Sequence, residues 1–291
     1  MSPVEIGMLS VIAIVVLVYM GLYIPIALGL VSFVSVWIMS GKSILAFNFL
    51  KIAVGDGVTE YNFATIPLFT LMGLLVSKAG LGRNIYDVMN STFRKVLAGI
   101  GMATVGANAV FAAITGSSIA SASVFTKISV PEMLRYNYSK RFAVGVVAGS
   151  SVLGMIIPPS AMLIIYSFIS EQSVGDMFLA GIVPGLLLTG AYIFAIFSMA
   201  RIWPSYIGQD IKADEMPALG TSEMIHKAWP VLALIFLVLG GIYTGWLTPV
   251  EAGAAGASLA LVIAALRKSM SWNGLWSTLV ETGHITAAIL L

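Results

Sequence analysis

Residues 103–123 read ATVGANAVFAAITGSSIASAS, and most of these residues are Gly, Ala, Ser or Thr. The stretch lies in a charge-free run from Val96 to Thr126, which is closed by Arg94 and Lys95 at one end and by Lys127 at the other. One crossing of a bilayer needs only about 20 residues, and this run is clearly longer. Basic residues mark segment ends that face the cytoplasm, so both ends of the run are expected on one side.

A run that is too long for one crossing and that begins and ends on one side predicts a re-entrant hairpin. We expect the hairpin over 97–126, with its turn at Gly116, Ser117 and Ser118. Non-helical backbone at membrane depth is tolerated only where protein buries it or where it lines an aqueous cavity. The turn is therefore a candidate site for a solute or an ion.

The composition is that of a polytopic helical membrane protein. The chain is 59% hydrophobic and 10% charged, with a mean hydropathy of +0.99, whereas a soluble domain carries roughly 25% charged residues. There is no cysteine, which excludes a disulfide, a thiolate metal site and a cysteine nucleophile. The two histidines, His226 and His284, lie far apart in sequence, which argues against a histidine metal site.

The remaining apolar segments are separated by polar stretches of different lengths. The amphipathic pattern of residues 81–96 is typical of a helix that lies along the membrane surface. The stretch 41–60, with Asp56 and Glu60, is expected to be an external loop, solvated or in contact with a partner. The longest polar loop is predicted at 201–228. The apolar segments fall at 6–22, 25–40, 61–77, 97–125, 142–168, 177–200, 229–246, 250–266 and 274–291.

The basic residues predict the orientation of the chain. With the N-terminus placed outside, on the periplasmic side, the loops 78–95, 127–141, 201–227 and 267–268 fall inside and hold 13 of the 15 Lys and Arg residues. This is a strong positive-inside pattern. It depends on the re-entrant hairpin, because a single crossing at 97–125 would place the 127–141 loop outside.

A repeated motif divides the chain into two parts. Gly21-x3-Pro25-x3-Gly29 recurs in the C-terminal part as Gly245-x3-Pro249-x3-Gly253. In the predicted orientation the two copies point in opposite directions, which is typical of inverted-repeat secondary transporters. We therefore expect a first inverted repeat at 1–223 and the beginning of a second at 224–291. The second part is much shorter than the first, so the sequence predicts a C-terminally truncated chain.

The hairpin turn and a second interruption are the strongest candidates for an ion site. Gly116, Ser117, Ser118 and Ser121 offer hydroxyl and carbonyl oxygens, which suit Na⁺. The alternative is that small residues only allow close helix packing.

The second interruption is the sequence Gly154-Met-Ile-Ile-Pro158-Pro159-Ser160, which breaks the 142–168 segment. Prolines donate no backbone hydrogen bond and disfavour helix before them. Gly154, Ile157, Pro158 and Ser160 are therefore predicted to expose oxygen atoms to the same cation. A simple proline kink is the alternative.

Several other polar residues have a weaker claim to a function. Asn108, Ser123 and Pro159 are candidates for contact with the transported solute, although a bridge between helices is preferred for Asn108. Glu251 would be a proton carrier if it lay within the membrane. It follows Thr248-Pro249, however, and this order is that of a capping box at a helix start. The structural interpretation is therefore preferred for Glu251.

Five motifs in order resemble the large membrane subunit of TRAP transporters, the DctM-like family. They are IPLFTLMG (66–73), GSSIASASVFTKISVPEM (116–133), GMIIPPSAMLIIY (154–166), DMFLAGIVPGLLL (176–188) and GIYTGWLTPVEAGAAGA (241–257). The resemblance implies an all-α polytopic inner-membrane protein, an elevator-type carrier with two inverted repeats, each with a re-entrant hairpin and a broken helix.

The resemblance also implies an activity and partners. The expected function is Na⁺-coupled import of organic anions such as dicarboxylates, sialic acids or sugar acids, delivered by a periplasmic substrate-binding protein. A small four-helix, DctQ-like membrane subunit is the other expected partner, and no nucleic acid is expected. An unrelated ion channel or a proton-coupled carrier is the alternative function. An enzyme is not expected, because no acid–base constellation accompanies the serines.

Overall fold

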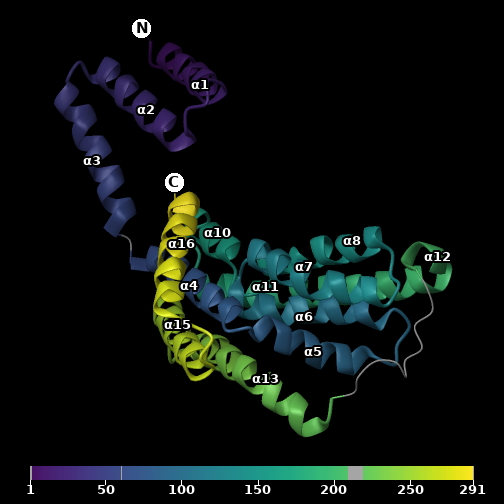
Figure 1. Cartoon of the computed structure of the whole chain (residues 1–291). Helices are drawn as coiled ribbons and strands as arrows, with labels where there is room; N and C mark the ends of the chain where they lie inside the picture. Colours follow the sequence, from purple (N-terminus) through teal and green to yellow (C-terminus); the bar gives the residue numbers. More distant parts are fainter. Residues whose placement is uncertain (1, 60, 209–218, 291) are drawn as a thin grey trace. The chain divides into compact units, whose positions relative to one another are not determined.

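The computed structural model describes residues 2–59, 61–208 and 219–290, and in these ranges the chain forms helices and no strand (Figure 1). It divides into two compact units, Met1–Phe63 and Ala64–Ile289. The boundary between the predicted repeats lies elsewhere, near 223, and stays a prediction. The expected all-α membrane protein is confirmed. Positions 209–218, which include Asp210, Asp214 and Glu215 of the predicted polar loop, lie outside the described residues.

The N-terminal unit holds three helices, α1 (Pro3–Tyr19), α2 (Ile24–Ser40) and α3 (Ser43–Thr59). The Ser10 and Ser35 hydroxyls, 2.7 Å apart, join α1 to α2. The third helix corrects the expected loop at 41–60. Residues 44–54 are apolar except for Asn48 and Lys51, and this composition is compatible with a helix among lipids or other helices. Glu60 lies outside the described residues.

The larger unit begins with a bent pair of helices. After a 3₁₀ turn at Tyr61–Ala64, α4 (Thr65–Lys78) and α5 (Leu81–Phe93) meet at an angle of 67°. Gly80 lies between them with a φ of +72°, a backbone conformation that glycine adopts without strain. The amphipathic helix expected at 81–96 is thus present as α5. Its buried residues contact α6, and its inclination to a bilayer stays a prediction.

The predicted hairpin is a pair of helices, α6 (Gly99–Thr115) and α7 (Ser118–Arg135), that fold back on each other. The rings of Phe111 and Phe125, one on each arm, pack edge to face with centroids 5.5 Å apart. The second arm continues to Arg135 rather than ending at 126, because Phe125, Ser129 and Met133 continue its buried face. The predicted 127–141 loop is correspondingly shorter.

The segment predicted to be a broken helix at 142–168 is broken where expected. It consists of α8 (Lys140–Ser151), α9 (Leu153–Ile156) and α10 (Ala161–Ile169), with a bend of 42° across residues 157–160. The longest helix, α11 (Val174–Ile202), follows, and a short helix, α12 (Pro204–Ile207), ends this part of the chain.

The C-terminal part of the larger unit is a further helical region. It holds α13 (Thr221–Ile235), a π-helical turn at Phe236–Gly240, α14 (Gly241–Tyr243), α15 (Pro249–Leu266) and α16 (Trp272–Leu290). Helix α13 begins well before the predicted start at 229. Its polar first turns are stabilised by contact with α5, so they do not form a loop.

Ion pairs and hydrogen bonds connect α5 to the C-terminal helices. The Lys227 Nζ lies 2.9 Å from Asp87 Oδ2 and 3.2 Å from Glu223 Oε1. With the Asn84 amide assigned in the orientation that satisfies its hydrogen bonds, its oxygen accepts from the Arg267 guanidinium at 2.8 and 2.9 Å. Three of the predicted cytoplasmic loops, 78–95, 201–227 and 267–268, therefore contribute residues that meet.

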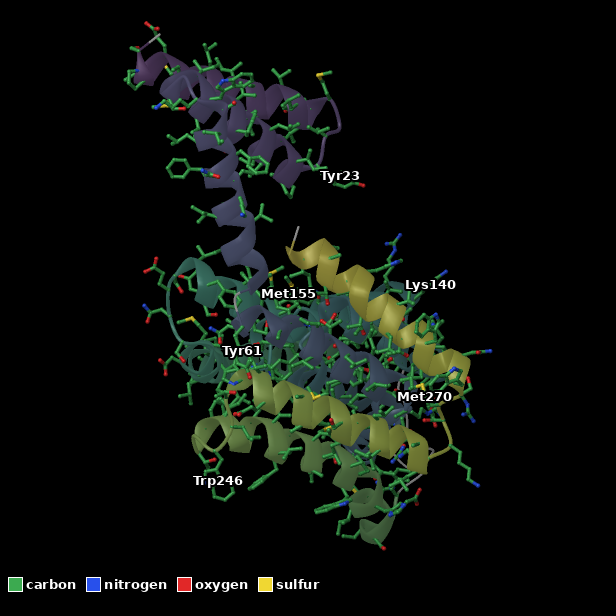
Figure 2. The ribbon with its side chains drawn as sticks, turned by 90° about the vertical axis from the view of Figure 1, so that its left-hand side faces the viewer. Tyr23, Tyr61, Lys140, Met155, Trp246 and Met270 are labelled. Atoms are coloured by element: carbon green, nitrogen blue, oxygen red, sulfur yellow. The ribbon has the colours of Figure 1, made fainter. Side chains whose placement is uncertain are left out.

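The fourth of these loops lies near α12 and the start of α6. The Ser139 amide donates to the Ile207 carbonyl at 2.7 Å, and the Tyr138 hydroxyl lies near the backbone of Ile100. Figure 2 shows Lys140 and Met270 toward one side of the larger unit and Trp246 toward the other. These contacts agree with a common side for the basic loops, whereas the absolute orientation and the N-terminal placement stay predictions.

Among the described residues, three helices are long and apolar enough to cross a membrane, namely Val174–Ile202, Thr221–Tyr243 and Pro249–Leu266. If each bent pair of helices counts as one span, these residues hold up to five spans. Helices α1, α2, α3 and α6 are apolar but shorter. The chain is thus a multi-pass helical membrane protein.

The two copies of the repeated motif have the same local structure. Gly21 and Gly245 both end a helix with a positive φ, of +89° and +74°. Pro25 and Pro249 then lie in the first turn of the next helix. The motif therefore codes for one kind of helix–turn–helix corner, used twice.

Candidate functional site

The tip of the hairpin is formed by a short break between two helices. Gly116 ends α6 with a φ of +57°, and Ser117 is the N-cap of α7. The Ser117 hydroxyl accepts a hydrogen bond from the Ala120 amide at 3.3 Å. Serine is a preferred N-cap because its oxygen satisfies an amide that the helix leaves free. The turn predicted at 116–118 is confirmed.

The interruption of the second segment is a short extended stretch. Ile157 is extended, two prolines follow, and Ser160 is the N-cap residue of α10. The Ser160 hydroxyl donates to the Met155 carbonyl at 2.6 Å. A side chain beyond the break thus satisfies a carbonyl at the end of α9. A simple proline kink would not include such a hydrogen bond.

These two breaks lie directly against each other. A β-carbon at Gly154 would lie 2.7 Å from the carbonyl carbon of Ser117 and 2.9 Å from the amide nitrogen of Ser118. A β-carbon at Gly116 would overlap the carbonyl oxygen of Pro159. The Ala161 amide donates to the Gly116 carbonyl at 3.4 Å. The structure therefore brings Gly116, Ser117, Ser118, Gly154 and Ser160 together.

Three glycines outside the predicted site allow this close approach. A β-carbon at Gly73 of α4 would lie 3.0 Å from the Thr115 backbone. On α11, β-carbons at Gly181 and Gly185 would lie 2.7 Å from the Ile156 carbonyl oxygen and 2.6 Å from the Ile157 side chain. The sequence alone does not assign these glycines to the site. The spacing of Gly181 and Gly185 by four was the available signal, because it places two residues without side chains on one helix face.

Helix ends of both polarities meet at this junction. The C-terminal ends of α6 and α9 carry partial negative charge, whereas the N-terminal ends of α7 and α10 carry partial positive charge. Cations are stabilised by the first kind of end and anions by the second. The junction thus has elements that can interact with a cation and an anion.

Four of the predicted residues lie at the edges of the junction or beside it. Ser121 is fully buried on α7, and its hydroxyl has no hydrogen-bond partner among the described residues. Pro158 and Pro159 are buried in the break, whereas Ser123 is exposed. A role of Ser123 or Pro159 in solute contact stays a prediction.

Asn108 forms the bridge between helices that its position favoured. It is fully buried on α6, and its Nδ2 donates to the Ser150 hydroxyl of α8 at 2.6 Å. Ser150 in turn donates to the Val146 carbonyl at 2.6 Å. The bridge is confirmed, whereas contact between Asn108 and a solute stays a prediction.

The described residues named at the junction, 116–118, 121, 154 and 157–160, include no Asp or Glu. Across the described ranges no group of three or more His, Cys, Asp or Glu residues could hold a metal ion. Glu251 is the partner of Thr248 in a capping box, and its carboxylate accepts from the Thr248 amide and hydroxyl at 2.8 Å each. This confirms the preferred structural interpretation of Glu251. A cation at the junction would have neutral oxygen ligands.

Comparison with known proteins gives one consistent family. The family model described as "Tripartite ATP-independent periplasmic transporter, DctM component" matches residues 11–291. The chain is 33% identical over 230 residues to the C4-dicarboxylate TRAP transporter large permease protein DctM of Pseudomonas aeruginosa, which covers 77% of this chain and 52% of that protein.

Two further relatives have the same kind of name. The chain is 36% identical over 203 residues to the C4-dicarboxylate large permease protein of Vibrio cholerae, covering 68% of this chain and 43% of that protein. It is 30% identical over 233 residues to an isethionate TRAP transporter permease protein of Oleidesulfovibrio alaskensis, covering 78% and 35%. The chain spans about half the length, or less, of these curated relatives.

Proposed function

The chain belongs to the DctM component family of tripartite ATP-independent periplasmic transporters, and on this premise we propose that it acts in Na⁺-coupled import of organic anions. Its relatives are named as TRAP transporter permease proteins, which are transporters rather than enzymes. The proposal is carried by one observation, the contact of the hairpin tip at Ser117 with Gly154 in the broken helix.

Sodium fits the oxygen atoms at this contact. Hard cations prefer oxygen ligands, and the junction offers backbone carbonyls at two helix ends together with the hydroxyls of Ser117, Ser118 and Ser160. The buried, unpaired Ser121 hydroxyl supports a polar ligand on the inner face of α7. We propose Gly116, Ser117, Ser118, Ser121, Gly154, Ile157, Pro158 and Ser160 as the region that holds the coupling ion.

An organic anion fits the other polarity of the junction. The amides at the N-terminal ends of α7 and α10 favour a carboxylate or sulfonate. Relatives are named for C4-dicarboxylates, isethionate and sialic acid, which all carry such a group. This shared chemistry supports an organic anion as the substrate of this chain. A cation and an anionic substrate that bind near one junction would each strengthen the binding of the other, because their opposite charges attract.

The architecture and the partners belong to the same proposal. The matching corners at Gly21 and Gly245 support two repeats, which we propose to be inverted and to move as an elevator. We propose that a small four-helix membrane subunit and a periplasmic substrate-binding protein complete the transporter, as the tripartite family name implies. A proton-coupled carrier is less well supported, because Glu251 is occupied in a capping box.

Uptake measurements test this function. The transporter is reconstituted from the large and small membrane subunits with its binding protein, and uptake of radiolabelled succinate and isethionate is measured under an inward Na⁺ gradient. We expect Ser118→Leu to abolish Na⁺-stimulated uptake while the protein still inserts into the membrane, because leucine places an apolar side chain at the tip. Uptake by this variant at the wild-type rate would contradict the proposed site.

A further inference from the structure

We propose that the end of the larger unit around α12 is a binding surface for the headgroups of anionic phospholipids. The surface, here called the basic collar, consists of Arg135, Lys140, Arg141 and Arg201 together with Trp203 and Tyr206. The four cations come from the ends of α7 and α11 and from the start of α8. The collar is separate from the junction and is not needed for the proposed transport chemistry.

The charges of the collar have no acidic partner among the described residues. All four basic residues are exposed, and no ion pair joins them to an acid within the described residues. The described ranges 94–141 and 201–208 contain a single acid, Glu132. Glu132 is half-buried and lies near Tyr86 of α5. Counted over the described residues, the collar therefore has a net positive charge that an external anion can neutralise.

Backbone contacts hold the parts of the collar together. The Ser139 amide donates to the Ile207 carbonyl, and the Ser139 hydroxyl donates to the Tyr206 carbonyl, each at 2.7 Å. Gly208 packs so closely on Tyr138 that a β-carbon there would lie 3.0 Å from the Tyr138 α-carbon. These bonds fix α12 against the loop that precedes Lys140 and Arg141, so the cations of the two segments share one surface.

Two aromatic side chains indicate that this surface meets a membrane interface. Trp203 and Tyr206 are 59% and 51% exposed, at the end of the apolar helix α11. Tryptophan and tyrosine are enriched at the level of lipid headgroups because their rings are amphipathic. Basic residues beside them attract anionic lipids of the facing leaflet. Aromatic rings at headgroup level and unpaired cations together favour a phospholipid over a soluble anion.

Fluorescence quenching by brominated lipids tests the proposal at one residue. The protein is reconstituted in phosphatidylcholine nanodiscs that contain a small fraction of either brominated phosphatidylglycerol or brominated phosphatidylcholine. The difference between the wild type and Trp203→Phe gives the signal of Trp203. We expect brominated phosphatidylglycerol to quench Trp203 several-fold more strongly, since each nearby basic residue raises anionic-lipid binding by about fivefold.

A charge-matched pair of variants shows whether the collar causes this preference. Lys140→Gln/Arg141→Gln/Arg201→Gln is expected to bring the quenching ratio of the two lipids close to one, because most of the electrostatic attraction to the anionic headgroup is lost. The control Lys42→Gln/Lys51→Gln/Lys268→Gln removes the same charge from exposed residues elsewhere and is expected to retain the preference. Equal quenching by the two lipids in the wild type, or an unchanged preference in the collar variant, would overturn the proposal.

The salt dependence gives a second test that needs no charge variant. Raising the ionic strength from about 0.1 M to about 1 M shortens the screening length from about 10 Å to about 3 Å. The phosphatidylglycerol preference of wild-type Trp203 should therefore fall toward one. A preference that persists at high salt would show that the collar does not act through charge. Free phosphate at millimolar concentration should not compete, and full competition would assign the surface to a soluble anion instead.

Discussion

Gly154 lies against the peptide bond that joins Ser117 to Ser118, so that a β-carbon at position 154 would lie 2.7 Å from the Ser117 carbonyl carbon. Contacts of this length to backbone cannot be relieved by a side-chain movement. The broken helix and the hairpin tip thus meet backbone to backbone, and the geometry of the candidate ion site depends on the absence of a side chain at this residue.

Gly154→Ala is therefore predicted to abolish Na⁺-stimulated uptake, because the added methyl group would separate the tip from the break. Gly145→Ala is the matched control, since Gly145 lies on α8 with no atom within 4 Å of the added β-carbon. Initial uptake rates of the two variants in the reconstituted transporter give the comparison. Equal activity of both variants would contradict a functional junction at Gly154.

Asn108→Ala is predicted to destabilise the protein by about 1–3 kcal/mol, because it removes a buried hydrogen-bond donor. Its partner variant Ser150→Ala should have an effect that is not additive with it, since both variants remove one bond. The free energy of unfolding of the two single variants and the double variant measures this coupling. Additive losses, or an increase in KM without any loss of stability, would contradict the bridging role.

The ion pair between α5 and α13 is predicted to stabilise the fold modestly. Asp87→Asn should lower the free energy of unfolding by about 1 kcal/mol, because both partners are about three-quarters buried. Arg83→Gln is the control, as its side chain is 61% exposed and its pair with Asp87 is 3.5 Å long. A thermal unfolding series in one detergent compares them, and an equal loss in both variants would show that Lys227 is not the important partner.

The topology is predicted to place the two loops that flank the hairpin on one side. The chain has no cysteine, so single cysteines report cleanly. Lys95→Cys and Lys140→Cys, one on each side of the hairpin, should react with a membrane-impermeant maleimide from the cytoplasmic side only, and Lys42→Cys from the periplasmic side. External labelling at 140 together with cytoplasmic labelling at 95 would mean that the hairpin segment crosses the membrane. Cytoplasmic labelling at 42 would overturn the periplasmic N-terminus, and would be explained by α3 crossing.

The features predicted most closely from the sequence are those determined by short-range rules. The hairpin turn follows from Gly116 and an N-cap serine, the break from Pro158 and Pro159, and the capping box from Thr248 and Glu251. Each rule involves residues within one helical turn, so the sequence contains all the information that the local structure needs.

The features that were wrong or missing depend on partners distant in sequence. Residues 221–228 were expected in a loop because they are charged, yet Lys227 pairs with Asp87, 140 residues away. Helix α3 occupies most of the 41–60 stretch, which the sequence predicts to be an external loop. Gly73, Gly181 and Gly185 were not assigned because their importance arises only where other backbones approach them.

Binding of Na⁺ to the junction is the central claim, and a comparison of thermal unfolding in Na⁺ and K⁺ tests it most directly. The purified protein is unfolded in the same detergent at equal ionic strength with either cation, without substrate. Binding to the folded state alone raises the free energy of unfolding by about 2.7 kcal/mol at a hundredfold excess over Kd. We predict a higher Tm in Na⁺ for the wild type and for Gly145→Ala, and no such difference for Gly154→Ala. Identical unfolding of the wild type in Na⁺ and K⁺ would contradict Na⁺ binding at the junction.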